Sequence, residues 1–290
     1  MNSLSPSPAE ALAAALVTGL RRELYLTPKP GLVDRRDSGS HRDLSLATME
    51  DSIRLMGFYL RQLLGALADG AGLQALATVG RRAEERMLRE LGTNTHKGGI
   101  FLCGLLVAAR FRTVGEGPQD LRRAVAELAA EFFAAAPATA TNGARVRKRF
   151  ARGGVVAEAR AGLPSLFEIA LPAWVEGFAL AGDETLADFF VLARLMQTVD
   201  DTTALHRCGE TGLARLRRDG RRLEARIAAG LDPVPLLTAL NADYRAMHLT
   251  MGGVADLLGA AAGYRLYRCA CAGEFRGCRK SPARMVPSRA

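Results

Sequence analysis

The sequence has few signals for β-strands and few cysteines. Alternating runs of β-branched and aromatic residues are missing, and aromatic residues make up only 6% of the chain, which argues against a strand-based fold. The five cysteines are odd in number, and their spacing matches no disulfide framework for a chain of 290 residues. We therefore expect reduced thiols. Cys269, Cys271 and Cys278 have no fourth ligand nearby, so we expect no zinc site there.

Long hydrophobic runs are also missing. The apolar stretch from Ile100 to Ala109 is bounded by Lys97 and Arg110 and is far shorter than the ~20 residues that cross a bilayer. The first residues lack the positive start that precedes the apolar region of a secretory signal, and they continue directly into an amphipathic helix. We expect no transmembrane segment, no membrane partner and a cytoplasmic location.

The excess of positive charge is uneven. The net charge is +9, and residues 265–290 carry seven basic residues against Glu274 alone, so +6 of the charge lies there. A second basic cluster, from Arg145 to Arg152, includes one aromatic residue, Phe150, and lacks the interleaved aromatics of a platform for single-stranded nucleic acid. That cluster is either a solvated face or a polyphosphate contact. We expect no nucleic-acid partner.

Helical periodicity dominates the rest of the chain. Between 73 and 91 the apolar residues recur every three to four positions, with arginines and glutamates on the other side. The predicted fold is all-α: one globular domain of about ten helices over residues 1–267, followed by a basic tail, 268–290, that we expect to be disordered. The expected helices lie at about 8–26, 45–68, 73–91, 96–112, 119–136, 165–181, 184–199, 211–229, 234–248 and 252–267.

Polar, glycine-bearing strings interrupt these helices. The first, TPKPGLVDRRDSGSH, runs from Thr27 to His41 and is followed by Asp43. Its prolines and glycines impose a fixed, non-helical path that carries Lys29, Asp34 and Arg35 as well as His41. A charged surface loop, with Asp43 as the N-cap of the next helix, is the alternative.

The second string is GTNTHKGGIF, from Gly92 to Phe101, which leads into an apolar helix. Free backbone N–H groups at a helix N-terminus, together with Lys97, suit a phosphate. The spacing of a Walker A loop is missing, and Thr93 or Thr95 as a simple helix cap is an equal alternative. Upstream, Glu84 lies on the polar side of its helix.

Three further strings place carboxylates at helix ends. They are AEARAGLP with Glu158, DDTTALHRCG with Asp200 and Asp201, and MGGVADLL with Asp256. Adjacent aspartates can hold Mg²⁺ through one or two carboxylates, although such a pair is more often a surface cap. The motifs of the common hydrolases, zinc proteases and dinucleotide-binding folds are missing. The strings therefore indicate an enzyme that acts on phosphorylated substrates.

The strings resemble those of the triphosphoribosyl-dephospho-CoA synthases. In order, they are TPKPGLVDRRDSGSH with Asp43, NTHKG, AEARAG(L)P, DTT with Arg207, and GG(V)ADLL, so the resemblance spans about Glu23 to Leu258. It implies an enzyme that transfers the triphosphoribosyl group of ATP to the 2′-hydroxyl of 3′-dephospho-CoA. The reaction releases adenine and forms 2′-(5″-triphosphoribosyl)-3′-dephospho-CoA, precursor of the prosthetic group of citrate lyase or malonate decarboxylase.

The second half departs from the family pattern. Val156 stands where the pattern has arginine, and Thr203 where it has asparagine. A glycine pair after Arg207 is reduced to Cys208 and Gly209, and Ser-Pro-Gly-Gly-Ser is replaced by residues 250–254, TMGGV. These changes leave two alternatives open: a divergent relative acting on another nucleotide or pentose phosphate, or a non-catalytic helical module that binds nucleotides or nucleic acid.

The resemblance also implies a set of site residues. The proton of the acceptor hydroxyl needs a base, the triphosphate needs cations and Mg²⁺, and positive charge on the ribose needs carboxylates. The catalytic candidates are Asp34, His41, Asp43 and Glu158. The substrate-binding candidates are Lys29, Arg35, Asn94, Thr95, His96, Lys97, Gly98, Arg207, Gly252 and Gly253. The Mg²⁺ candidates are Glu84, Asp201 and Asp256.

Overall fold

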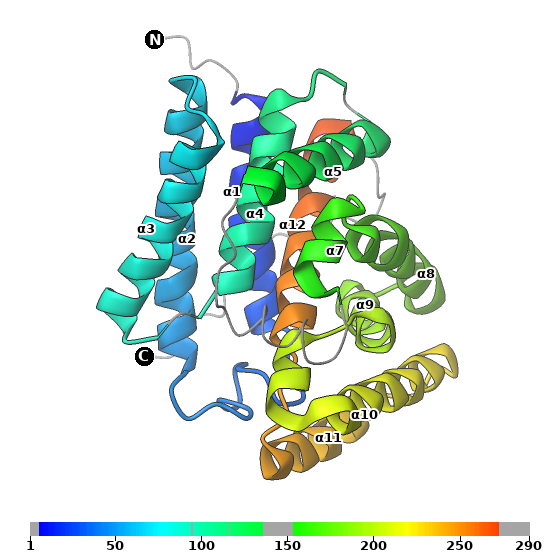
Figure 1. The fold of residues 1–290 in the computed structure, drawn as a ribbon. Coiled ribbons are helices and arrows are strands. Elements are labelled where there is room, and N and C mark those ends of the chain that lie inside the picture. The colour runs from blue at the N-terminus through cyan, green and yellow to red at the C-terminus, as the bar shows by residue number, and fades with distance from the viewer. Residues whose placement is uncertain (1–5, 94, 116, 136–152, 273–290) are drawn as a thin grey trace, which may run out of the picture.

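The computed structural model describes residues 6–93, 95–115, 117–135 and 153–272, and every regular element in those ranges is a helix (Figure 1). The predicted all-α class is therefore confirmed. The elements are α1 (Pro8–Tyr25), α2 (Leu46–Ala68), α3 (Leu73–Leu91), α4 (Lys97–Arg112), α5 (Pro118–Ala135), α7 (Gly154–Arg160), the π-helical η1 (Ser165–Ala170), α8 (Leu171–Ala181), α9 (Glu184–Thr198), α10 (Thr202–Ala228), α11 (Val234–Met247) and α12 (Gly252–Ala272).

All ten predicted ranges correspond to observed helices, and the differences have local causes. The sequence pattern does not predict α7. The predicted start at 211 falls inside α10, after a break at Gly209, where φ is 63° and ψ is −160°. Only glycine adopts that conformation readily. Because the helix is interrupted there, the sequence pattern does not predict the short first part of α10.

The last helix continues past the expected domain end at 267. Tyr267 and Arg268 are each only 7% exposed, and the helix ends at Ala272. The expected tail beyond it, 273–290, lies outside the described residues, as does the basic cluster at 145–152. Among the described cysteines, Cys103, Cys208 and Cys271 are free thiols, as expected. The expectation is wrong for Cys269, which is disulfide-bonded.

Three helices form the centre of the bundle. Helix α1 packs along α12 and against α4, and α2 and α3 flank them on one side, while α5 and α7–α9 lie on the other (Figure 1). Helices α10 and α11 lie below this assembly (Figure 1). The α1–α12 contact is close because three glycines line it: Gly19, Gly259 and Gly263.

A buried charge cluster ties α12 to α9. The Asp188 carboxylate accepts hydrogen bonds from Arg22 Nε at 2.5 Å and from Trp174 Nε1 at 3.0 Å. Arg265 of α12 is 1% exposed, and its guanidinium carbon lies 4.0 Å from the Trp174 ring centroid. Arg265 was included in the positive charge of residues 265–290, but its side chain belongs to the core.

The lengths and hydropathies of the described helices bear on membrane spanning. None of these helices alone is long and apolar enough to cross a membrane. The pair Gly154–Arg160 and Ser165–Ala181, bent by 81°, meets the criteria of length and composition when taken together.

The glycine crossing gives a stability prediction with a matched control. A Cβ at Gly19 would lie 2.2 Å from the backbone nitrogen of Gly263, so Gly19→Ala forces α1 and α12 apart. We expect a loss of about 3 kcal/mol in the free energy of unfolding. Gly65 of α2 has nothing within 4 Å of its Cβ position, so Gly65→Ala is expected to stabilise by up to about 1 kcal/mol. Urea denaturation of both variants tests this, and equal effects would contradict it.

Candidate functional site

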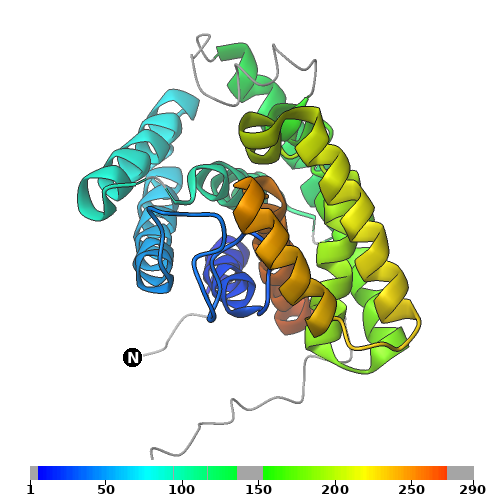
Figure 2. The same ribbon diagram turned by 90° about the horizontal axis from the view of Figure 1, so that it is seen from below.

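The polar strings meet at one end of the bundle. Seen from below, the loop between α1 and α2 runs between the α2–α3 pair and α11 (Figure 2). The N-termini of α4, α10 and α12 lie at the same end, joined to one another and to the loop by the contacts described next.

The loop has a fixed path because its own carboxylates bind its backbone. The Asp34 carboxylate, 2% exposed, accepts from the backbone N–H groups of Lys29 and Arg36, both at 2.7 Å, and of Asp37 at 3.3 Å. Ser40 Oγ lies 2.6 Å from the backbone oxygen of Leu249, which docks the loop on the α11–α12 connection. Asp34 therefore holds the loop together, and its oxygens are occupied.

His41 is clamped between the connection and α10. Its Nε2 lies 2.9 Å from Thr250 Oγ1, and its Nδ1 lies 3.4 Å from Arg207 Nη2. An arginine has only donors, so Nδ1 accepts and Nε2 carries the proton that Thr250 accepts. Burial, with Arg207 nearby, lowers the pKa of His41 to about 4. His41 is therefore neutral at pH 7.

Arg207 fastens the same corner. Its Nη1 donates to the backbone oxygen of Ser40 at 2.9 Å. The same nitrogen lies 3.5 Å from the backbone oxygen of His248. The residue is exposed on one side, so the guanidinium can also meet a ligand.

Asp43 links the first string to the second. Its Oδ2 accepts from Thr93 Oγ1 at 3.1 Å, and its Oδ1 lies 3.9 Å from His41 Nδ1. The Asp43 side chain is 60% exposed. Ser45, not Asp43, is the N-cap of α2, so the capping alternative for Asp43 is wrong.

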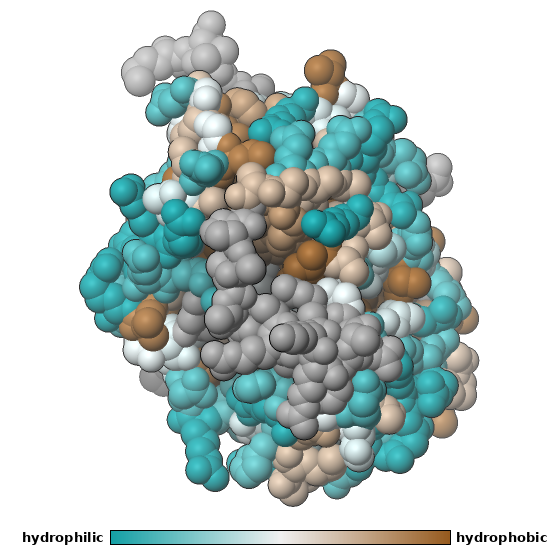
Figure 3. All heavy atoms as spheres, viewed as in Figure 1, coloured by the Kyte–Doolittle hydropathy of each residue, from teal (hydrophilic) through white to brown (hydrophobic). Residues whose placement is uncertain are grey.

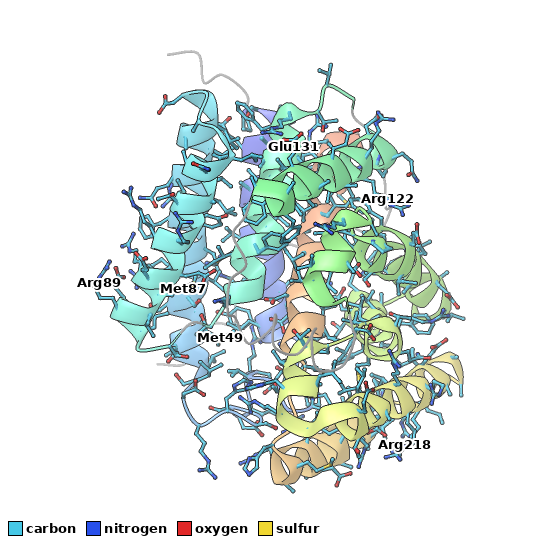
Figure 4. The ribbon with its side chains drawn as sticks, viewed as in Figure 1. Met49, Met87, Arg89, Arg122, Glu131 and Arg218 are labelled. Carbon is cyan, nitrogen blue, oxygen red and sulfur yellow. The ribbon has the colours of Figure 1, made fainter. Side chains whose placement is uncertain are left out.

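The second string is anchored under α2. His96 is the N-cap residue of α4 and is 4% exposed, and neither Thr93 nor Thr95 caps the helix through its side chain. The buried Ser52 hydroxyl contacts Thr95 Oγ1 and lies 2.6 Å from His96 Nδ1. These groups lie beside Met87, where α3 meets α2 (Figure 4).

The sequence reasoning missed Ser52 and Thr250. A signal for Ser52 exists: it shares the apolar face of α2 with Leu55, Met56 and Tyr59, and a polar residue on such a face needs a partner. Thr250 falls in a string without a distinctive pattern.

Asp201 joins two helices. Its Oδ1 accepts from Thr203 N and Ala204 N, both at 2.9 Å, and from Thr203 Oγ1 at 2.5 Å. Its Oδ2 accepts from Val254 N, in the first turn of α12, at 2.9 Å. The side chain is 1% exposed. Asp201 is therefore a helix cap, as the alternative held, but a buried one.

Asp256 lies over the start of α4. A Cβ at Gly98 would be 2.0 Å from Asp256 Oδ2, so a side chain there would displace the carboxylate, and one at Gly99 would be 3.2 Å from Oδ1. Burial raises the pKa of Asp256 well above its usual range, helped by the carboxylates of Glu23 and Asp201 and opposed by the Gly99 N–H.

Lys29 and Glu23 form a buried pair near this carboxylate. The Lys29 ammonium, 1% exposed, contacts the Glu23 carboxylate and donates to the Glu23 backbone oxygen at 2.6 Å. Burial raises the pKa of Glu23, and Lys29 opposes that shift. Lys29 therefore neutralises a core carboxylate and does not face outward.

The remaining candidates are more dispersed. Glu158 Oε1 accepts from Ser165 N at 2.6 Å, and burial raises its pKa. Gly252 N donates to Thr203 Oγ1 at 2.7 Å, and a Cβ at Gly253 would lie 3.1 Å from Asp201 Oδ2. The Arg35 guanidinium carbon lies 4.4 Å from the Tyr25 ring centroid. Asn94 lies outside the described residues.

The three Mg²⁺ candidates do not form a metal centre. Within the described ranges, no group of three or more His, Cys, Asp or Glu side chains is arranged to hold a metal ion. Asp201 uses both oxygens as caps, as described above, and Glu84 Oε2 lies 3.1 Å from Lys97 Nζ. Asp201 therefore does not fit a role as a Mg²⁺ ligand.

A cavity of about 910 Å³ begins beside Lys97 of the second string. It lies between α2, α3, α4, α5 and α7, and Lys97, Glu84, Val156 and Arg160 are among its lining residues. In the view of Figure 3, hydrophobic residues gather on the face over α4 and α5. The cavity therefore connects the second and third strings through an apolar interior.

Comparison with known proteins shows the family. A family described as ATP:dephospho-CoA triphosphoribosyl transferase matches residues 9–272. The chain belongs to this family of transferases.

Similar proteins cover nearly the whole chain. A probable 2-(5″-triphosphoribosyl)-3′-dephosphocoenzyme-A synthase of Stutzerimonas stutzeri is 37% identical over 264 residues, 88% of this chain and 91% of that protein. The 2-(5″-triphosphoribosyl)-3′-dephosphocoenzyme-A synthase of Klebsiella pneumoniae is 36% identical over 275 residues, 90% of this chain and 97% of that protein. No solved structure matches the chain significantly. The resemblance drawn from the strings is confirmed at the level of the family.

The role of Asp201 can be separated from metal binding by stability. In Asp201→Asn, an amide NH₂ group replaces one carboxylate oxygen and faces N–H groups that now donate hydrogen bonds to that oxygen. We therefore expect a loss of about 2 kcal/mol in the free energy of unfolding. Asp51→Asn, at an exposed position, should change it by less than about 0.5 kcal/mol. Denaturation without Mg²⁺ tests this. An Asp201→Asn protein as stable as the parent, with altered Mg²⁺ dependence, would restore the metal role.

His96 makes stability depend on pH. Burial, with Lys29 nearby, lowers its pKa from 6.5 to about 4. Between these values the unfolded chain binds a proton that the folded chain does not, so stability present above pH 6.5 is lost as pH falls toward 4. His96→Gln should reduce this slope by up to about 1.4 kcal/mol per pH unit. Denaturation curves of the parent protein and of His96→Gln between pH 7 and 4.5 test this, and an equal slope in the two proteins would contradict it.

Proposed function

We propose that this chain transfers the triphosphoribosyl group of ATP to the 2′-hydroxyl of 3′-dephospho-CoA and releases adenine. The observation that carries the proposal is the meeting of His41, Asp43, Thr93 and Arg207, from three separate strings, in one partly exposed cluster. Family membership supplies the substrates.

Asp43 is the best-placed base in the described site. A general base must reach the hydroxyl of a bound substrate, which needs an accessible oxygen. Asp34 has its oxygens occupied by backbone N–H groups, and His41 has a pKa of about 4 with Nδ1 turned to Arg207. The Asp43 carboxylate is exposed. The hydroxyl proton passes to Asp43 as the new C–O bond forms, and adenine leaves with the electrons of the glycosidic C–N bond and takes up a proton from water.

Cations at the surface of the cluster suit the triphosphate. Arg207 is held by backbone oxygens, so its guanidinium is fixed before substrate binds. Lys97 is 55% exposed at the start of α4, where a helix N-terminus also favours anions. His41 then positions Arg207 and Asp43.

Mg²⁺ stays a prediction. We place it with the triphosphate, held mainly by phosphate and water and by at most one protein carboxylate, because the described residues offer no cage. A cytoplasmic location and a link to citrate lyase or malonate decarboxylase stay predictions as well.

Adenine release tests the proposal. Wild-type protein with ATP and Mg²⁺ should liberate adenine only when 3′-dephospho-CoA is added, as measured by chromatography. Asp43→Asn should lower kcat by about 10²-fold or more, while Arg207→Ala should raise the KM for ATP by about tenfold or more. Arg218 gives a control on the same helix (Figure 4), because its side chain is 58% exposed and away from the cluster. Wild-type protein that releases no adenine with both substrates would refute the function.

A further inference from the structure

The cavity has no part in the roles assigned so far, apart from Lys97 at its edge. We propose that it binds the acceptor, 3′-dephospho-CoA, with the pantetheine arm against its apolar wall and the diphosphate beside Arg81 and Arg160, while Lys97 stays with the triphosphate. This inference rests on the proposed function, because the function supplies the identity of the acceptor.

The interior of the cavity is apolar and aromatic. Phe101 of α4 packs against Phe132 and Phe133 of α5, with ring centroids 5.9 and 5.6 Å apart, and all three rings line the space. Tyr59 adds its ring from α2, and the absence of a side chain at Gly104 makes room for the Tyr59 hydroxyl, which would lie 2.0 Å from a Cβ. Such walls suit an uncharged chain with few polar groups.

The edge of the cavity is positive. Three exposed cations, Arg81, Lys97 and Arg160, line it, and Glu84 is the acidic residue among the lining residues described. Arg81 donates to Thr78 at 2.7 Å, and the Arg160 guanidinium carbon lies 5.5 Å from the Phe133 centroid. Guanidinium groups beside an aromatic wall are well suited to a diphosphate, which accepts their paired N–H groups.

The shape favours the acceptor over ATP. Both substrates carry adenosine and phosphates, but only dephospho-CoA has a long uncharged arm. A volume of about 910 Å³ is at the upper end of the roughly 300–1,000 Å³ found for ligand pockets, more than a purine alone needs. Lys97 follows His96 at the start of α4. An arm in the cavity therefore puts the diphosphate at the cations and directs the adenosine, with its 2′-hydroxyl, toward the cluster.

Helix α7 offers a test of the charge itself. Val156 and Arg160 are one helical turn apart, and both line the cavity. An arginine at either position can therefore reach the same space. Under this proposal, binding of the acceptor needs a positive charge on α7, and the charge can stand at either position.

Direct binding by titration calorimetry separates the two substrates. Arg160→Ala should weaken binding of 3′-dephospho-CoA by about tenfold and leave that of ATP within about twofold. Adding Val156→Arg to Arg160→Ala should restore most of the loss. Arg82, an exposed neighbour of Arg81 that does not line the cavity, is the control, and Arg82→Ala should change neither affinity.

Two further experiments test whether the pantetheine arm binds in the cavity: a substitution that fills the cavity and a fragment of the acceptor. Ala77 lines the cavity from α3 and is only half-buried, so Ala77→Phe should weaken 3′-dephospho-CoA binding about tenfold with little change in ATP binding. The fragment 4′-phosphopantetheine should compete with 3′-dephospho-CoA and not with ATP. Circular dichroism checks folding, and Arg160→Ala tests the proposal if Ala77→Phe fails to fold.

The outcomes distinguish the two claims. Unchanged 3′-dephospho-CoA binding in Arg160→Ala, or a loss of ATP binding instead, overturns the cavity assignment while adenine release still supports the function. Absence of adenine release from wild-type protein that binds both substrates overturns the function. The expected pattern in both assays supports the cavity as the acceptor site.

Discussion

The carboxylate of Asp201 fixes the arrangement on which the site depends. It accepts hydrogen bonds from the first turn of α10 and from Val254 of α12, so two positive helix ends share one negative group. Both helices are thereby held next to the α11–α12 connection. That connection presents Thr250 to His41, and α10 presents Arg207 to the same histidine. The shared cap therefore supports both sides of the clamp on His41.

Buried charges support this corner from inside the bundle. Asp256 meets the Gly99 N–H at the start of α4, and burial together with the nearby Glu23 carboxylate raises its pKa. A buried charge is tolerated when it is paired and hydrogen-bonded. His96 stays neutral against the Ser52 hydroxyl. The buried polar groups therefore hold the backbone, and the groups left at the surface, Asp43, Arg207 and Lys97, are the ones able to meet substrates.

The sequence predicts most of the helices well because they bury one face against neighbouring helices, which imposes a period of 3.6. It also identifies the strings that meet at the site. It does not predict which carboxylates hold the backbone and which one is free to meet a substrate. Asp34, Asp43 and Asp201 are the same residue type in similar strings, but two of them are occupied by backbone N–H groups and one is exposed. That division depends on distant partners, as does the cavity, whose walls come from five helices.

The departures from the family pattern preserve this geometry where the structure describes it. Thr203 stands in place of asparagine, yet its hydroxyl donates to Asp201 and accepts from Gly252 N at 2.7 Å, the two kinds of contact an amide can also make. Val254 stands in place of serine but serves through its backbone N–H, which valine also has.

Of the glycine pair after Arg207, Gly209 is kept, and its φ of 63° is the one that needs glycine. Cys208 needs no such conformation, and its thiol lies 3.3 Å from the backbone oxygen of Met247. Val156 differs from the others, because it removes a charge from the lining of the cavity. Arg160, which belongs to a matching string, lies one turn away and keeps a positive charge in the same space. The chain thus varies at positions where the backbone contact or the local charge can be kept by other means.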